Sequence, residues 1–242
     1  DEALADSATT ANVPKNKFDN NRFDVVYSVG MTRTSVLVRE LDIANQTTKK
    51  IVRFNPAEDA VPYAYSHASA LDNTTLRFVS REGTTSWQIV EALKAIDILE
   101  GDISVIPAEG ALAPGNYEIK LGDRRFDILE KMKLIQSGRL ADVWAGRDEN
   151  TPVATAEELL ILASIIEVET GPFDERFLIA SVFANRLKKG MPLQADPTVI
   201  YGITLGKGHL GRGLHESELL GDTPWNTYVN AGLPPAPIAN PS

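Results

Sequence analysis

The chain has 242 residues, with 33 acidic and 24 basic side chains, a net charge of −9 and no cysteine. This length corresponds to one large domain or two small ones, and it can bury a core without disulfides. The lack of cysteine excludes disulfide frameworks and thiolate chemistry, and the acidic balance argues against a nucleic-acid partner. The longest apolar run, residues 159–166, is too short to cross a bilayer, and the acidic start does not resemble a signal peptide.

The first part of the chain changes character near residue 22. Residues 1–21 contain few large apolar side chains and predict a flexible leader. Short runs of β-forming residues follow, and we expect strands over residues 24–29, 35–41 and 50–54. Residues 56–73 carry Pro, Ser, His, Tyr and Asn without a period, which predicts a surface loop.

A strand–helix–strand unit is predicted over residues 74–120. Its first strand covers residues 76–80, and Thr85 with Gln88 matches a capping box at the start of a helix. The apolar residues behind this box recur at helical spacing, namely Ile89, Val90, Leu93 and Ile96. Further strands are expected over residues 103–106 and 117–120.

A long helix is predicted next, over residues 123–144, with a weak break at Gly138. The polar, proline-containing stretch behind it predicts a boundary near residue 150. The sequence therefore predicts a connecting helix over residues 121–150.

The last part, residues 151–242, is predicted to be helical at first and then rich in loops. Thr155 and Glu158 form a second capping-box pattern, and helices are expected up to Thr170 and over residues 174–189. From Met191 onward Gly, Pro, Asn and Asp dominate, and loops of this length are often functional. With the β-rich region at 22–73, these elements predict an α+β fold.

Two carboxylates interrupt the apolar helix over residues 156–170. Glu167 and Glu169 are two residues apart, about 200° around a helix, so they face nearly opposite directions. Glu167 continues the buried face of Leu160, Ala163 and Ser164. A carboxyl group held against an apolar face has a raised pKa and can act as a general acid. Alternatively, Glu167 marks only the point where the helix emerges into water.

Polar and aromatic side chains alternate in the loops behind these helices. Short hydroxyl and amide groups beside aromatic rings are typical of sugar sites, because rings cover the apolar face of a pyranose. Ordinary turns stiffened by proline would explain the same composition. The candidates are Gln194, Asp196, Thr198, Tyr201, Trp225, Asn226, Tyr228 and Asn240.

His209 and His215 lie in a glycine-rich stretch with acidic neighbours. The HESEL segment lacks the second histidine of a zinc-protease motif, and mobile glycines preorganise ligands poorly. The sequence therefore predicts no metal site and no cofactor. A metal-dependent hydrolase that uses these two histidines is an alternative, which inhibition by a chelator would reveal.

Three long motifs make the chain recognisable: LASIIEVETG at 162–171, VFANRLKKGMPLQADPTVIYG at 182–202 and TPWNTYVNAGLPPAPIANP at 223–241. Together they resemble the MltG/YceG-like family of endolytic murein transglycosylases. The upstream segments EGTTSWQIVEAL at 82–93 and PAEGALAPGNYEI at 107–119 are similar to the LysM-like subdomain of that family.

The resemblance implies cleavage of the β-1,4 bond between N-acetylmuramic acid and N-acetylglucosamine, with a 1,6-anhydro end as product. It identifies the first glutamate of the E-x-E-T motif, Glu167, as the catalytic residue. Because the C6 hydroxyl of the sugar attacks, one carboxyl can serve as acid and then as base, where hydrolytic glycosidases need two. The residues implied for the cleft are Gln194, Asp196, Thr198, Tyr201, Asn226 and Tyr228, with Glu169 and Asn185 in support.

The resemblance also implies a setting for the protein. It predicts a catalytic region on the periplasmic side of the inner membrane, with glycan strands as substrate and peptidoglycan synthases as partners. A membrane anchor and a further C-terminal segment of the family have no counterpart in the 242 residues, which predicts a piece of a longer protein. A non-catalytic peptidoglycan-binding or scaffold protein is the alternative function.

Overall fold

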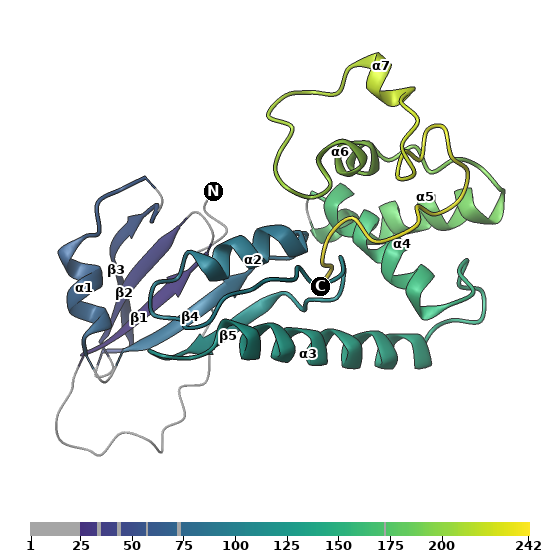
Figure 1. Cartoon of the computed structure of the whole chain (residues 1–242). Coiled ribbons are helices and arrows are strands. Elements are labelled where there is room, and N and C mark those ends of the chain that lie inside the picture. Colours follow the sequence, from purple (N-terminus) through teal and green to yellow (C-terminus); the bar gives the residue numbers. More distant parts are fainter. Residues whose placement is uncertain (1–24, 33–34, 43–44, 57, 72–73, 172) are drawn as a thin grey trace.

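A computed structural model describes residues 25–32, 35–42, 45–56, 58–71, 74–171 and 173–242. The predicted leader at 1–21 lies outside these residues. The described part contains one five-stranded sheet and a set of helices (Figure 1), so the predicted α+β class is confirmed. None of its helices combines the length and the apolar composition needed to cross a bilayer.

The sheet joins the two regions that the sequence analysis separated. Its strands are β1 (Val25–Met31), β2 (Val36–Asp42), β3 (Thr47–Phe54), β4 (Thr75–Ser80) and β5 (Gly115–Ile119). Their order is β3-β2-β1-β4-β5, and only the β1–β4 pair is parallel. Regions 22–73 and 74–120 therefore share one sheet, and the strand–helix–strand unit is not a separate layer.

Three helices cover the apolar face of this sheet: α1 (Tyr63–Ser69), α2 (Ser86–Lys94) and α3 (Arg125–Ala145). Their buried residues form one cluster with those of the strands, running from Val29 to Met132. We call the described residues of 25–145 the sheet unit. The capping box at the start of α2 is confirmed, because Thr85 accepts from the Gln88 N–H and Gln88 accepts from the Thr85 N–H.

Two predictions in the sheet unit are wrong. The expected loop at 56–73 contains α1, which buries Tyr65 and Ala68 and is too short to show a helical period. The expected strand at 103–106 is irregular: β4 pairs directly with β5, and residues 103–106 lie in the connection between α2 and β5.

The expected break at Gly138 is also wrong, because α3 continues through this residue. A Cβ at Gly138 would meet nothing within 4 Å, so the residue lies on the open side of the helix. A glycine there costs about 1 kcal/mol of helix stability relative to alanine, which does not interrupt a long, packed helix.

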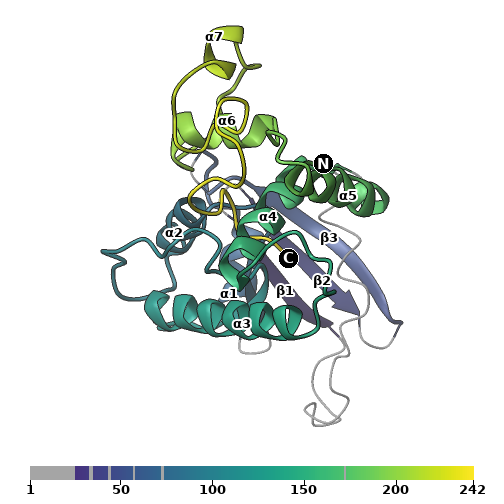
Figure 2. The same cartoon turned by 90° about the vertical axis from the view of Figure 1, so that its right-hand side faces the viewer.

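The second part of the chain, residues 153–242, is built from four helices and long connections, and we call it the helical unit. Both views place α3 on one side of this unit and α7 on the other (Figure 1; Figure 2). Its core includes Leu162, Ile165, Phe183 and Leu193, and Trp144 of α3 packs against it. The helices are α4 (Ala156–Glu169), α5 (Arg176–Lys188), α6 (Asp196–Thr204) and α7 (Glu216–Leu219).

Helix α4 confirms the predicted helix and its Thr155 cap, which accepts from the Glu158 N–H at 3.1 Å. The reciprocal half of the predicted capping box is not formed, because the Glu158 carboxylate accepts from the Ala154 N–H instead. Helix α6 was predicted as loop. Pro197 stiffens its first turn, where a proline sacrifices no helical hydrogen bond. Pro197 therefore indicated a helix start, and the interpretation of residues 196–204 as loop was wrong.

Asn240 connects the two units. It is fully buried, and its backbone pairs with the turn before α2: Gly83 N–H donates to Asn240 O at 2.9 Å, and Asn240 N–H donates to Thr84 O at 3.1 Å. Its side-chain oxygen accepts from Leu112 N–H at 2.8 Å. The side-chain NH₂ donates to Thr84 O, Ser86 Oγ and Glu109 Oε1, at 2.9, 3.2 and 3.1 Å.

Glu109 is the second member of this junction. One carboxylate oxygen accepts from the Ser86 N–H at 2.7 Å, and the other accepts from the Tyr201 hydroxyl of α6 at 3.2 Å. Burial raises the pKa of Glu109, although these hydrogen bonds act in the opposite direction. The junction therefore contains a carboxyl group whose protonation is coupled to the contact between the units.

Replacing Asn240 with alanine should destabilise the whole protein. The substitution leaves the Leu112 N–H without its acceptor and removes donors to the sheet unit, at about 1–3 kcal/mol for each buried group left unpaired. Chemical denaturation should show a lower free energy of unfolding. Asn116→Ala, at an exposed position of β5, is the control, and an equal loss in both variants would contradict the role of Asn240.

The stability of the protein should depend on pH through Glu109. Its pKa in the folded protein lies above the ordinary value of 4.5. The contribution to stability is therefore complete below that ordinary value and is lost as the pH rises through the raised pKa. Glu109→Gln should flatten this decline in unfolding free energies measured between about pH 4 and about pH 8. The same slope in wild type and variant would show that Glu109 is not its source.

Candidate active site

The end of α4 presents two carboxylates to different surroundings. Ser164, one turn earlier, is fully buried and donates to Ile161 O at 2.7 Å. The Glu167 side chain is 7% exposed on this buried side, whereas Glu169 is an exposed residue. The predicted opposite orientation of the two glutamates is thus confirmed.

Glu167 is held by a cation and a backbone amide. Its Oε1 accepts from Arg176 Nη2 at 2.7 Å, and its Oε2 accepts from the Ser242 N–H at 2.9 Å. A Cβ at Gly83 would lie 3.8 Å from Glu167 Cγ, so the turn before α2 covers this side chain. The sequence predicts that Glu167 lies against an apolar helix face. The structure instead surrounds it with groups that stabilise a carboxylate.

Glu169 is the last residue of α4, and two of the predicted cleft residues, Asp196 and Tyr228, lie near it. Burial raises the pKa of Glu169, and the neighbouring Asp196 carboxylate raises it further. Asp196 Oδ1 accepts from the Tyr228 hydroxyl at 2.6 Å. This hydrogen bond is the main reason why the pKa of Tyr228 is raised to about 12. The acid with raised proton affinity at this helix end is therefore Glu169.

The segment before α6 completes the cluster and contains a strained residue. Gln194 has φ of 54°, in the left-handed region that residues with a side chain seldom adopt. Its N–H donates to Thr227 O at 3.0 Å, and its side-chain oxygen accepts from Arg186 Nη1 at 3.1 Å. The same Nη1 donates to the carbonyls of Pro192 and Leu193 at 3.2 and 2.7 Å. Strain of this kind persists where surrounding contacts over-determine the backbone, and it concentrates at functional sites.

Two residues predicted for the cleft are buried and hold the loops instead. Thr198 is fully buried, and its hydroxyl lies 2.9 Å from that of Thr227. Asn226 is also fully buried, and it donates to the carbonyls of Leu219 and Gly221 at 3.0 and 2.7 Å. The expectation that these two side chains contact a ligand is corrected, because neither reaches the surface.

The remaining predicted residues lie around the cluster. Tyr201 is partly buried, donates to Glu109 and packs against Trp225, with 5.4 Å between ring centroids. Asn185 has an exposed side chain on α5. The structure therefore places Asp196 and Tyr228 near Glu169, with Gln194 two residues before Asp196, and it places Tyr201 at the junction.

The segment that contains His209 and His215 holds an ion pair between Arg212 and Glu218, where the alternative hypothesis placed a metal. Arg212 pairs with both oxygens of Glu218, at 2.8 and 2.7 Å, and the His215 N–H donates to the same carboxylate at 2.8 Å. The arginine holds the pKa of Glu218 down to about 2. Within the residues that the structure describes, no three histidine or acidic side chains are grouped as metal ligands.

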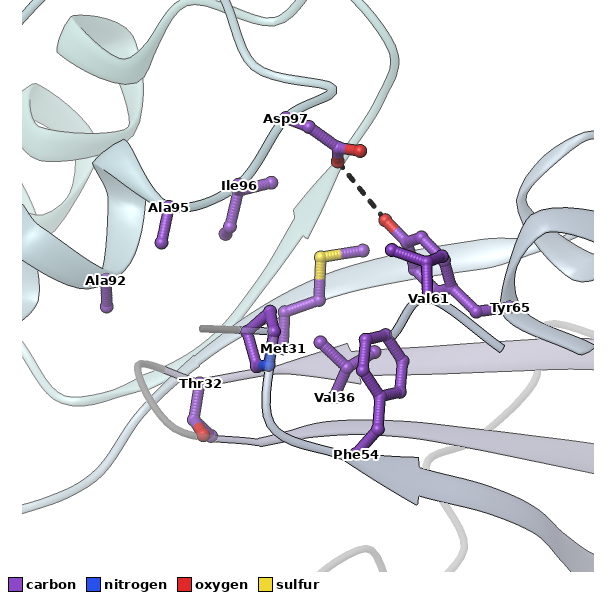
Figure 3. A pocket seen from close by; sticks show the side chains of 11 residues that line it. Met31, Thr32, Val36, Phe54, Val61, Tyr65, Ala92, Ala95, Ile96 and Asp97 are labelled. Carbon is purple, nitrogen blue, oxygen red and sulfur yellow. Dashed lines mark hydrogen bonds between the residues drawn. The ribbon is translucent and has the colours of Figure 1, made fainter. Parts of the chain in front are cut away.

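A pocket in the sheet unit is distant in sequence from all predicted site residues. Figure 3 shows its lining, in which Tyr65 of α1 donates to Asp97 at 3.2 Å beside Met31, Val36 and Phe54. The ring of Phe54 packs edge-on against Tyr65, at 5.4 Å between centroids. Apart from the Tyr65–Asp97 pair, this lining is mostly apolar, so it offers no acid and base for glycan chemistry.

Sequence reasoning missed Arg176 and Arg186. Arg176 begins α5, where a cation opposes the helix dipole. A basic residue at such a position could have indicated an acidic partner, which is Glu167. Arg186 lies in the last turn, where cations are ordinary, so no signal distinguished it from its neighbours Lys188 and Lys189.

Comparison with known proteins agrees with these motifs. The sequence model of the YceG-like family matches residues 57–242. An endolytic murein transglycosylase of Bacillus subtilis is 42% identical over 134 residues, which are 55% of this chain and 36% of that protein. One of Streptococcus pneumoniae (strain D39) is 34% identical over 140 residues, with 55% of this chain and 24% of that protein covered.

The chain thus spans only about a third and a quarter of the lengths of these two relatives. The fold also has a counterpart among solved structures. A crystal structure of a putative yceG-like protein from Listeria monocytogenes matches with a TM-score of 0.60 and 26% identity, covering 78% of this chain and 71% of that one. Because the family model matches residues 57–242, which include β4, β5, all three helices of the sheet unit and the whole helical unit, the chain belongs to the YceG-like family.

Proposed function

We propose that this chain cleaves the glycan strands of peptidoglycan as an endolytic murein transglycosylase. The bond broken is the β-1,4 bond between N-acetylmuramic acid and N-acetylglucosamine, and the product carries a 1,6-anhydro end. The observation that carries the proposal is the exposed Glu169 with its raised pKa, placed beside Asp196 and Tyr228. The relatives named endolytic murein transglycosylase support the same reaction.

One carboxyl group is sufficient for this reaction. Protonated Glu169 donates its proton to the glycosidic oxygen as the bond to C1 breaks, and the positive charge that develops at C1 is attacked by the C6 hydroxyl of the same sugar. The hydroxyl proton returns to Glu169, so no water molecule is consumed and the acid is regenerated. Nearby carboxylates and dipoles stabilise the oxocarbenium-like charge.

Glu169 takes the catalytic role in this proposal, and Glu167, which the motif comparison identified, takes a structural one. Both carboxylate oxygens of Glu167 are occupied, one by Arg176 and the other by the Ser242 N–H, and its side chain is only 7% exposed, so it is not open to a glycan. Glu167 is also covered by the turn at Gly83. These contacts support the assignment, and substitution of each glutamate distinguishes the two.

The wider setting is part of the proposal. We place the enzyme outside the cytoplasm, in contact with peptidoglycan and with peptidoglycan synthases, and anchored in the inner membrane through a part of the protein beyond these residues. Residues 74–120 take the LysM-like role of holding glycan, with Gln194 and Tyr228 in the cleft. Capture of purified peptidoglycan without release of products would favour the alternative of a scaffold protein.

Substitution of the two glutamates should separate chemistry from stability. Glu169→Gln should lower the yield of anhydro ends by about 100-fold or more, the usual contribution of general acid–base catalysis, while the fold is retained. Glu167→Gln should still cleave, but with about 1–3 kcal/mol less stability because the ion pair is lost. Mass spectrometry of digested glycan strands and chemical denaturation measure the two effects.

Glu157→Gln, at an exposed position in the first turn of α4, is the control and should match wild type in both measurements. Loss of cleavage in the Glu167 variant alone would return the catalytic role to that residue. Reducing ends in place of anhydro ends would indicate a hydrolase.

A further inference from the structure

Two acidic residues of the candidate site lie at opposite kinds of helix end, one at a C-terminus and the other at an N-terminus. Glu169 is the last residue of α4, where unpaired backbone carbonyls disfavour a negative charge, and Asp196 is the first residue of α6, where unpaired N–H groups favour one. The two helices pack against each other. The end of α4 therefore disfavours the charged form of Glu169.

Asp196 is fixed in place by its neighbours. The Tyr228 hydroxyl donates to it at 2.6 Å, a length typical of hydrogen bonds to a charged acceptor. The segment that leads to Asp196 is held by Arg186, which bonds the Leu193 carbonyl and the Gln194 side chain. These contacts maintain the left-handed backbone of Gln194.

The charged and titratable groups around Glu169 come from several elements. Asp196 of α6 acts on it directly, and Tyr228 lies close enough to respond to both carboxylates. Arg186 of α5 acts on Tyr228. Glu167 and Arg176 neutralise each other on the other side of α4. α3, which also packs on α4, contributes Trp144 to the shared core. Asp196 is therefore the negative charge that Glu169 faces.

We propose that Asp196 is a positioning residue whose carboxylate, fixed by Tyr228, favours the protonated form of Glu169 before the reaction and makes Glu169 a stronger base afterwards. This inference rests on the proposed function and changes the role predicted for Asp196, from sugar ligand to fixed charge. When Glu169 gives its proton to the glycosidic oxygen, two negative charges face each other. Their repulsion favours return of a proton, which the C6 hydroxyl supplies as it attacks C1.

The test is a titration of Glu169 that needs no turnover. In protein labelled with ¹³C at glutamate side chains, the Glu169 carboxyl signal is identified by its absence in Glu169→Gln. Asp196→Asn removes the charge but still accepts from Tyr228, and it should move the titration midpoint of Glu169 to lower pH. Because the acid must be protonated, the alkaline limb of the pH profile of kcat should move to lower pH as well, with little change in KM.

Matched variants separate charge from structure. Asp196→Glu retains the charge, so the titration midpoint of Glu169 should be that of the wild type. Glu157→Gln removes one charge at the far end of α4 and should leave the Glu169 midpoint unchanged. Asp196→Ser, which is also favourable at a helix start, replaces the asparagine variant if that variant does not fold. A Glu169 midpoint equal in Asp196→Asn and Glu157→Gln overturns the inference. A wild-type protein that yields no anhydro ends overturns the proposed function instead, since the titration still measures the coupling.

Discussion

The contact of Asn240 with the turn before α2 determines how the two units sit against each other. The backbone of buried Asn240 pairs with Gly83 and Thr84. Its side-chain oxygen accepts from Leu112 N–H and its NH₂ group donates to Thr84 O, so both also bond the sheet unit. Buried polar groups are tolerated only when they are satisfied, so the segment around residue 240 has a single acceptable position. That position also brings Ser242 to Glu167 and Glu109 to Tyr201. The candidate site thus depends on an interaction outside it.

The geometry of helix α4 places its two glutamates in different surroundings, one in the core contacts and the other at the candidate site. One side, with Ser164 and Glu167, faces the core, the C-terminal segment and Arg176, while its last residue faces α6. A spacing of two residues suffices for this separation, because it rotates the second side chain by about 200°. Neighbouring acids of one motif can therefore have unrelated roles, and only their partners distinguish the roles.

Much of the fold could be predicted, since β1, β2, β4, α2 and α4 follow from runs of β-forming residues and from capping residues. Helix α6 could not, because its proline was ambiguous between a loop and a helix start. The shared sheet could not either, since pairing of β1 with β4 is a long-range contact without a local signal. In the candidate site, Gln194, Asp196 and Tyr228 follow from residue type and stay predictions, whereas Thr198 and Asn226 have the same chemistry but are buried. Composition does not separate a hydroxyl or amide that binds ligand from one that holds a loop.

The junction also has a consequence for the order of folding. Asn240 and Thr84 are 156 residues apart in the chain, and contacts of such long range form late because closing the loop costs entropy. During synthesis the sheet unit can complete its core, which ends at Met132, well before residue 240 exists. The polar groups of Thr84, Ser86 and Glu109 then remain in water until the segment around residue 240 has been made. The candidate site would thus be assembled only after the sheet unit has folded.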